Sequence, residues 1–482
     1  MSKNYLLLFS SAIIGLSLVI SSFTGNGKVY NSQPGADTAT LPSFAKAKDH
    51  LGKNTASTNG FITLTSGLDN NHFLLDSTNR TGFLFLETKV DRFLNQTLRR
   101  IPLNISLVID RSGSMAGEKM DFAKKAAKGI IDRLTAEDFV SVVVYDELID
   151  VIQTATPVLH KDSIKAKIEK VKPRGSTNLW GGSEKGYEQV KNNYKKNYVN
   201  RVLLISDGLI TAGTKMPSRI IPRVQEYKDI EGISISTFGV GLDYNETLMT
   251  DMAENGAGNY YFIDRAEQMT AMFDKELNGM MNVAAQNAEL RITLPKGVNV
   301  EKTYPFKYGV VKNEVVIKFR DLFSEESKAL VMKFSLDDNL TKESKILARL
   351  SYTDIVDNSM KTIGTENLLI PVKNADAYLA YFNRMVAEQV VLFTANENME
   401  KAMLEADKGN YEAARKYAEA NGYFFRTNKS YVNTSRELQK MDSVNKFYGE
   451  DLARAGKMSA DSVKLMQKGK RAINYQIRNK KQ

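Results

Sequence analysis

The chain has 482 residues, more than one hydrophobic core usually organises, so two to four structural units are expected. It contains no cysteine, which excludes disulfides, thiolate metal sites and cysteine nucleophiles, and its three histidines are far apart in the sequence, which argues against a zinc peptidase. The formal net charge of +10 is spread along the chain except near its C-terminal end. Because cysteine is missing and the few histidines stand apart, the composition favours a protein that is not an enzyme.

The N-terminal segment, residues 1–25, is predicted to be a signal peptide or an N-terminal anchor. Lys3 precedes the apolar stretch Tyr5–Phe23, and small and polar residues follow it. A cleaved secretory signal and an uncleaved membrane anchor both fit this pattern, since the stretch is close to the length that spans a bilayer. In either case the protein is expected to be exported, and the absence of cysteine suits a bacterial periplasm or cell surface.

Two further segments precede the first large domain. Residues 26–59 are rich in small and polar residues without periodicity, so a flexible spacer is predicted there. Residues 60–100 contain short alternating or aromatic segments, such as FITLT and FLFLETKV, which predict strands separated by turns. A few short strands need another hydrophobic layer to be stable, so these strands require a partner from elsewhere in the chain.

Residues 101–282 alternate strand-like and helix-like segments, which is typical of a parallel sheet with helices on both faces. Several strands are continuous apolar runs, such as VSVVVY and VLLIS, as expected when both faces are covered. The predicted fold class is therefore α/β, with a doubly wound, mostly parallel six-stranded sheet. Its strands are expected at Asn104–Asp110, Phe139–Tyr145, Val151–Thr156, Val202–Ser206, Ile233–Gly239 and Asn259–Ile263.

Residues 283–374 are predicted to form strands without intervening helices, because turn clusters separate their apolar segments. We expect these strands to pack with those of residues 60–100 in one β-sandwich, into which the α/β domain is inserted. This arrangement supplies the hydrophobic layer that the N-terminal strands lack. The strands are expected at Glu289–Leu294, Val310–Phe319, Ala329–Leu336, Ile346–Tyr352 and Asn367–Val372.

Helical periodicity dominates residues 375–482. The segment Lys401–Phe424 predicts two helices separated by Gly409, and such a hairpin must pack on its neighbours because one unit cannot bury its own apolar face. From Lys457 onward the chain carries eight Lys or Arg and one acidic residue, and this basic tail is predicted to be a solvated, frayed terminus. No nucleic-acid motif accompanies it, so no nucleic-acid partner is expected.

Polar side chains of the α/β domain are predicted to meet at one edge of its sheet. Asp110, Ser112 and Ser114 come directly after the first strand. Thr177 lies in the GSTN loop that opens a helix, and Asp207 follows the strand RVLLI. Loops at the carboxyl ends of parallel strands share one edge of a sheet, so all five residues are expected to lie together. Their oxygen atoms are the ligands that hard divalent cations prefer.

With these motifs, residues 101–282 resemble a von Willebrand factor A (VWA) domain, because DRSGSM, RGSTN and SDG match its metal-ion-dependent adhesion site (MIDAS) in order and approximate spacing. The resemblance implies a Rossmann-like fold and a bound divalent metal, Mg²⁺ with Mn²⁺ or Ca²⁺ as alternatives. It implies that Ser112 and Ser114 bind the metal directly, and that Thr177 does so in the ligand-competent state. Asp110 and Asp207 are then expected to act through hydrogen bonds and bound water. The wider layout resembles bacterial exported VWA proteins related to inter-alpha-trypsin inhibitor heavy chains.

The resemblance also implies a function. If mostly neutral hydroxyls contact the metal ion, the ion keeps much of its charge and attracts an acidic side chain from outside. The leading hypothesis is therefore a cell-adhesion or protein-binding protein whose partner presents Asp or Glu to the metal. An envelope scaffold, in which the metal only stabilises the VWA fold, is the first alternative. A metal-assisted hydrolase is the weaker one, because no histidine lies near these motifs to act as a base.

Overall fold

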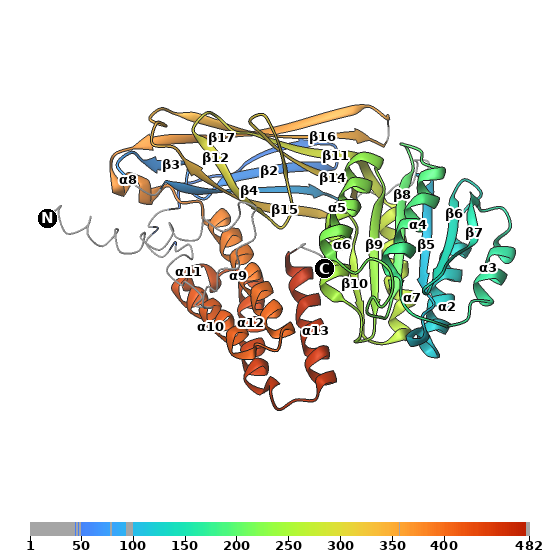
Figure 1. Cartoon of the computed structure of the whole chain (residues 1–482). Helices are drawn as coiled ribbons and strands as arrows, with labels where there is room; N and C mark the ends of the chain where they lie inside the picture. The colour runs from blue at the N-terminus through green and yellow to red at the C-terminus, as the bar shows by residue number, and fades with distance from the viewer. Residues whose placement is uncertain are drawn as a thin grey trace.

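The computed structural model describes Phe44, Ala47 and residues 50–77, 80–92, 100–355 and 357–478. In this part of the chain a β-sandwich, an α/β domain and a helical region pack against one another (Figure 1). The predicted signal or anchor, residues 1–25, lies outside the described residues, as does the predicted spacer up to residue 43. None of the helices in the described residues has the length and apolar character needed to cross a membrane.

The α/β domain is built on a six-stranded sheet. Its strands, in spatial order, are β10 (Tyr260–Ile263), β9 (Ser234–Val240), β8 (Val199–Ser206), β5 (Leu103–Asp110), β6 (Phe139–Tyr145) and β7 (Ile149–Pro157). Neighbouring strands are parallel, except that β7 runs antiparallel to β6. The central strands β5 and β8 are buried along their whole length, which explains their largely apolar sequences. The predicted mostly parallel, six-stranded sheet is confirmed.

Helices cover both faces of this sheet (Figure 1). One face carries α2 (Glu118–Arg133), α3 (Lys161–Glu169) and α7 (Met269–Met281), and the other carries α4 (Leu179–Asn192), α5 (Pro217–Glu226) and α6 (Glu246–Asn255). Short helical turns lie at η4 (Gly113–Met115), η5 (Tyr227–Glu231) and η6 (Ala266–Gln268). The apolar stripe of α2 turns inward, with Met120, Ala123 and Ile131 buried. The sheet is therefore held between two apolar cores, one on each face.

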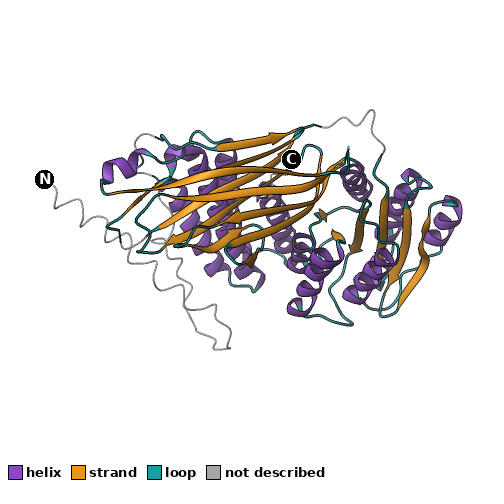
Figure 2. Ribbon diagram, turned by 90° about the horizontal axis from the view of Figure 1, so that it is seen from above, coloured by secondary structure: helices purple, strands orange, loops and turns teal. Residues whose placement is uncertain are grey.

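The β-sandwich takes strands from both sides of the α/β domain in the sequence. One sheet has the spatial order β1 (Thr55–Asn59), β2 (Ile62–Leu68), β4 (Thr81–Val90), β15 (Ser327–Leu336) and β12 (Val298–Tyr304). The other has the order β13 (Gly309–Val311), β14 (Glu314–Phe323), β11 (Val283–Thr293), β16 (Ser344–Asp354), β17 (Met360–Val372) and β3 (His72–Leu74). The α/β domain is thus an insertion between β4 and β11, and the sandwich lies beside it (Figure 2).

Three details of the sandwich differ from the sequence predictions. Residues 55–59, assigned to the flexible spacer, form the edge strand β1, because Gly60 at φ +57° makes the tight turn that returns the chain along β2. The predicted strand Val310–Phe319 is two strands, β13 and β14, since Lys312 at φ +58° lies in the turn between them. The strand β12 has no counterpart among the predictions, because its sequence VNVEKTY is largely polar and exposed at the sheet edge.

The helical region packs on the sandwich through α9. Its helices are α8 (Ala375–Ala380), α9 (Arg384–Asp407), α10 (Tyr411–Thr427), α11 (Lys429–Val432), α12 (Arg436–Ala455) and α13 (Ala460–Arg478). The predicted hairpin is confirmed, since α9 and α10 share one apolar core and Gly409, at φ +80°, lies between them. Val386 of α9 shares this core with Phe85 of the sandwich. Phe44, in the predicted spacer, is also buried here, and its amide donates a hydrogen bond to the Asn428 side chain (3.2 Å).

The basic C-terminal segment is part of the fold through Arg478. It forms α13, which lies against the α/β domain (Figure 1), and its Arg471 donates hydrogen bonds to Glu246 of α6 (2.9 Å) and Asp407 of α9 (2.7 Å). Lys468, 3.9 Å from Glu246, is buried as well. The prediction of a solvated, frayed tail is therefore wrong for this helix. The pairing is not visible in the sequence, because Glu246 lies 225 residues before Arg471.

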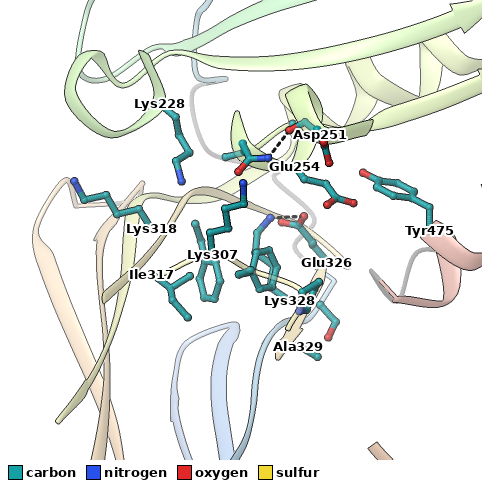
Figure 3. A pocket seen from close by; sticks show the side chains of 17 residues that line it. Lys228, Asp251, Glu254, Lys307, Ile317, Lys318, Glu326, Lys328, Ala329 and Tyr475 are labelled. Carbon is teal, nitrogen blue, oxygen red and sulfur yellow. Dashed lines mark hydrogen bonds and ion pairs between the residues drawn. The ribbon is translucent and has the colours of Figure 1, made fainter. Parts of the chain in front are cut away.

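A small pocket of about 100 Å³ marks the point where the three regions meet (Figure 3). The α/β domain contributes Asp251 and Glu254 of α6, the sandwich contributes Lys307, and α13 contributes Tyr475. The Tyr475 hydroxyl accepts a hydrogen bond from the amide of Tyr260 (3.1 Å) in the edge strand β10. The helical region thus covers one edge of the α/β sheet and helps to fix that domain against the sandwich.

The buried carboxyl of Asp69, at the end of β2, predicts a pH dependence of stability. Asp69 accepts a hydrogen bond from the Phe83 amide (2.8 Å), and burial raises its pKa to about 7. In the unfolded chain the pKa of Asp69 is about 4. Between about pH 4 and about pH 7 the carboxyl is therefore protonated in the folded state and ionised in the unfolded state. The free energy of unfolding should therefore fall by roughly 1.4 kcal/mol per pH unit as the pH rises from about 4 to about 7.

The substitution Asp69→Asn isolates this effect, because the amide keeps an acceptor oxygen for Phe83 but does not titrate. The melting temperature of wild type relative to Asp69→Asn should fall as the pH is raised from 5 to 7, measured by differential scanning calorimetry. All other titrating groups contribute equally to both proteins. Melting temperatures that run parallel across this range would contradict the assignment.

Candidate metal centre

A buried carboxylate at the end of β5 shapes the first loop of the candidate site. The Oδ1 of Asp110 accepts a hydrogen bond from the Ser112 amide (2.8 Å), and its Oδ2 accepts one from the Ser206 hydroxyl (2.7 Å). The first of these is the turn that an aspartate forms with the amide two residues on. The hydroxyls of Ser112 and Ser114 then lie 3.1 Å apart. Asp110 therefore positions the turn that brings the two hydroxyls together.

The charge of this carboxylate is not balanced by its own contacts. Burial, the largest effect, and the nearby Asp207 carboxylate raise the pKa of Asp110 to about 6, although hydrogen bonds from Ser206 and Ser112 oppose the shift. The Tyr145 hydroxyl also approaches Asp110 Oδ2 (3.4 Å). Two buried carboxylates in one site are costly unless positive charge lies close to them. A cation bound beside the two carboxylates would offset this cost.

The loop that carries Thr177 is tied to both neighbouring loops. The Thr177 amide donates to the Thr211 hydroxyl (2.8 Å), and the Thr177 carbonyl accepts from the amides of Thr211 and Ala212 (both 3.1 Å). On the other side, the Gly113 amide donates to the Gly175 carbonyl (3.1 Å). Asn178 then caps α4, its side chain accepting from the helix's third amide. Backbone hydrogen bonds therefore hold the three loops in one cluster.

Asp207 follows β8 and is fully buried. Its Oδ1 accepts a hydrogen bond from the Ser114 hydroxyl (2.8 Å), and its Oδ2 accepts one from the ammonium of Lys119 in α2 (2.5 Å). Lys119 is a site residue that the sequence analysis does not identify. No signal in the sequence distinguishes it from a solvated helix lysine, because its partner lies 88 residues away. Ser206 is a second such residue, although its place directly before Asp207 could have pointed to it.

Gly208 marks the point on which the three predicted hydroxyl groups converge. A Cβ atom at this position would lie 3.2 Å from Thr177 Oγ1, 3.3 Å from Ser114 Oγ and 3.9 Å from Ser112 Oγ. The first two distances are shorter than ordinary van der Waals contacts, so glycine leaves a space that a side chain would fill. The structure thus brings the predicted hydroxyls together, with the two predicted carboxylates directly behind them.

This arrangement fits a hard divalent cation. The donors are hydroxyl and carboxylate oxygens, without sulfur or imidazole, and Mg²⁺ prefers such ligands. Within the described residues no group of three or more His, Asp and Glu side chains could hold a metal ion. The hydroxyl-lined space is the candidate because three hydroxyl groups converge on it. The assignment of Ser112, Ser114 and Thr177 as direct ligands, with Asp110 and Asp207 behind them, stays a prediction.

Comparison with known proteins identifies the α/β domain. Residues 104–275 match the family model of the von Willebrand factor type A domain. The α/β domain therefore matches the VWA domain, as its motifs predict. VWA domains commonly bind proteins and typically hold a divalent metal at the MIDAS.

Several curated relatives share this domain. The chain is 31% identical over 191 residues to the uncharacterized protein YfbK of Escherichia coli, covering 39% of this chain and 33% of YfbK. It is 27% identical over 253 residues to the uncharacterized protein sll0103 of Synechocystis, covering 50% of this chain and 59% of that protein. Human inter-alpha-trypsin inhibitor heavy chain H2 is 28% identical over 322 residues, 63% of this chain and 32% of that protein. The matches thus span between about a third and three fifths of these relatives.

Solved structures resemble the whole arrangement. A von Willebrand factor type A protein from Catenulispora acidiphila aligns with a TM-score of 0.63 at 15% identity, covering 80% of this chain and 91% of that one. The ArnB paralog VWA2 from Sulfolobus acidocaldarius aligns with a TM-score of 0.58, also at 15% identity, covering 88% of this chain and 100% of that one. At this identity the likeness concerns the fold alone. It extends beyond the VWA domain, since that domain is much shorter than the aligned part of the chain.

The convergence on Gly208 predicts the effect of one added methyl group. The substitution Gly208→Ala places a Cβ against the Thr177 and Ser114 hydroxyls, so it should weaken Mg²⁺ binding at least about tenfold while leaving the fold intact. Isothermal titration calorimetry measures this affinity, and Trp180, the single tryptophan, lies at the start of α4 as a fluorescent reporter. Gly129→Ala in α2 is the matched control, because a Cβ there meets no atom within 4 Å. Equal Mg²⁺ affinities for the two variants would contradict the assigned position of the metal.

Proposed function

We propose that this chain is an exported, non-enzymatic VWA-domain protein that binds a protein partner through Mg²⁺ held at the MIDAS. The observation that carries the proposal is the convergence of the Ser112, Ser114 and Thr177 hydroxyls beside Gly208. Residues on three loops that are far apart in sequence form this one space. A merely structural loop cluster would not need a gap there, and glycine keeps it open.

The charges at the site support recognition of an acidic side chain. Both carboxylates are already engaged, Asp110 by Ser206 and Asp207 by Ser114 and Lys119. A metal ion in the hydroxyl-lined space would then be contacted mostly by neutral oxygens and keep much of its charge. An Asp or Glu carboxylate of the partner would supply the missing negative ligand. Mn²⁺ or Ca²⁺ would meet the same oxygen donors, so these ions are alternatives to Mg²⁺.

Export is supported by the sequence of residues 1–25, with Lys3 followed by an apolar stretch. A cleaved signal would release the protein to a bacterial periplasm or the cell surface, and an uncleaved one would anchor it in the membrane. The absence of cysteine agrees with this placement. Labelling intact cells and spheroplasts with a reagent that cannot cross membranes would distinguish export from retention.

A scaffold function is the second candidate. It is favoured by the close docking of the VWA domain on α13, where Arg471 joins Glu246 to Asp407. In that case the metal would only stabilise the VWA fold, and its removal would lower the melting temperature without changing partner binding. A metal-assisted hydrolase is the weaker third candidate, because hydrolysis needs a positioned base or nucleophile and the carboxylates here are engaged.

Affinity capture with the wild-type chain and the variant Thr177→Val tests the proposed function. Valine keeps the shape of threonine but has no oxygen for the metal, so partner recovery from cells of the source organism should be lost in the variant. In wild type it should be lost on chelation and restored by Mg²⁺. Quantitative mass spectrometry of the captured proteins measures both effects, and at least a tenfold loss is expected.

Thr250→Val is the matched control, because the Thr250 hydroxyl in α6 is buried, has no hydrogen-bond partner among the described residues and lies outside the site. It should recover the same partners as wild type. If Thr177→Val and chelated wild type also recover them unchanged, while chelation lowers the melting temperature, the scaffold function is the correct one and metal-dependent binding is wrong.

A further inference from the structure

A cleft lies between the VWA domain and the helical region, and its lining begins at Leu209, the residue after Gly208 of the candidate metal centre. The cleft encloses about 600 Å³. Its VWA wall includes Leu209 and Leu242, from the loops that follow β8 and β9. Its helical wall includes Tyr411 at the start of α10 and Val463 in α13. Apolar side chains therefore stand on both walls, and two separate regions of the chain form the cleft.

The cleft adjoins the metal centre through Leu209. Leu209 directly follows Gly208, the residue at which the hydroxyls converge. The relative solvent exposure of Leu209 is 58%. Gly241 directly precedes Leu242 of the same wall, and a Cβ atom at Gly241 would lie 3.4 Å from the ammonium of Lys119. Lys119 in turn bonds to Asp207. A chain segment bound at the metal therefore meets the apolar walls within a few residues.

Each of the seven charged groups that line the cleft has an ionic partner, with Lys408 bonded to Glu405 outside it (2.6 Å) and Lys468 lying 3.9 Å from Glu246. Arg471 joins Glu246 to Asp407, and Lys464 of α13 bonds to Asp243 (2.6 Å) across the boundary between the two regions. Apart from the polar side chains of Asn245, Thr247 and Gln467, the remaining side chains of the lining are aliphatic or aromatic. Single exposed leucines elsewhere on a surface carry no such meaning. The cleft thus complements an apolar side chain rather than a second charge.

We propose that the partner binds as an extended segment, with an acidic side chain at the metal and a large apolar side chain, about two to four residues away, between Leu209 and Val463. This inference rests on the proposed function and names the partner's chemistry. An extended chain advances about 3.3 Å per residue, so a separation of a few residues suits a wall that begins at the residue after Gly208. The cleft has walls on two sides, so an extended segment of the partner can enter it. A partner with a flat surface would contact only the rims of the cleft.

A phage-displayed library of linear 12-residue peptides, selected on the full chain in Mg²⁺, supplies a defined probe. The selected peptides should share an acidic residue and a large apolar residue at a fixed short separation, and chelation should release them. Binding of the best synthetic peptide is then measured by fluorescence polarisation. Leu209→Asp and Val463→Asp should each weaken it at least tenfold, while the affinity of Val463→Asp for Mg²⁺ alone stays equal to that of wild type.

Leu148→Asp is the matched control. Leu148 is as exposed as Leu209, at 57%, and follows β6 in the VWA domain, but it does not line the cleft. Its variant should bind the peptide like wild type. If Mg²⁺-dependent peptides bind Val463→Asp and Leu209→Asp as tightly as wild type, the cleft is not the docking surface and this inference is overturned, while the proposed function stands. If no selected peptide depends on Mg²⁺, the proposed function fails and this inference with it.

Discussion

The hydrogen bond from the Ser206 hydroxyl to the buried carboxylate of Asp110 joins the ends of β5 and β8, and the geometry of the candidate metal centre depends on it. The same carboxylate orders the turn that carries Ser112 through that residue's amide. Asp207, directly after Ser206, then receives the Ser114 hydroxyl. Burying two carboxylates in one place is costly unless cations lie beside them. The ammonium of Lys119 is one such cation, and a metal ion in the hydroxyl-lined space would be the second.

The rest of the chain places this centre in a defined setting. Insertion of the VWA domain between β4 and β11 attaches it to the sandwich at both ends, and α13 holds it from the side. Tyr475 and Arg471 of α13 reach the edge strand β10 and the helix α6. The loop after β8, which begins with Asp207 and Gly208 of the metal centre, lines a cleft shared with the helical region through Leu209. Any partner that reaches the metal through the cleft would contact both regions, which links recognition to the relative position of the domains.

Residues that act near their own strand ends could be predicted from the sequence, and residues that act across long separations could not. Asp110, Ser112 and Ser114 follow one strand directly, and the common edge of a parallel sheet is enough to bring them near the loops of Thr177 and Asp207. The β-sandwich followed from the same logic, since short strands without a second layer need partners from elsewhere. Contacts between residues far apart in the sequence leave no comparable pattern in it. The lysine of α2 that bonds to Asp207, the cations of α13 and the edge strand β1 all look like solvated polar segments, because their partners are known only once the chain is folded.

The most direct test of the account is anomalous X-ray diffraction from crystals of the full chain grown with Mn²⁺, which substitutes for Mg²⁺ and can be located by its own signal. The account predicts one strong anomalous peak beside Gly208, at bonding distance from the hydroxyls of Ser112, Ser114 and Thr177. Asp110 should lie behind that contact and should not bind the ion directly. A peak at another place in the chain, or none at this site under saturating Mn²⁺, would contradict the central claim that these three hydroxyls form a metal centre.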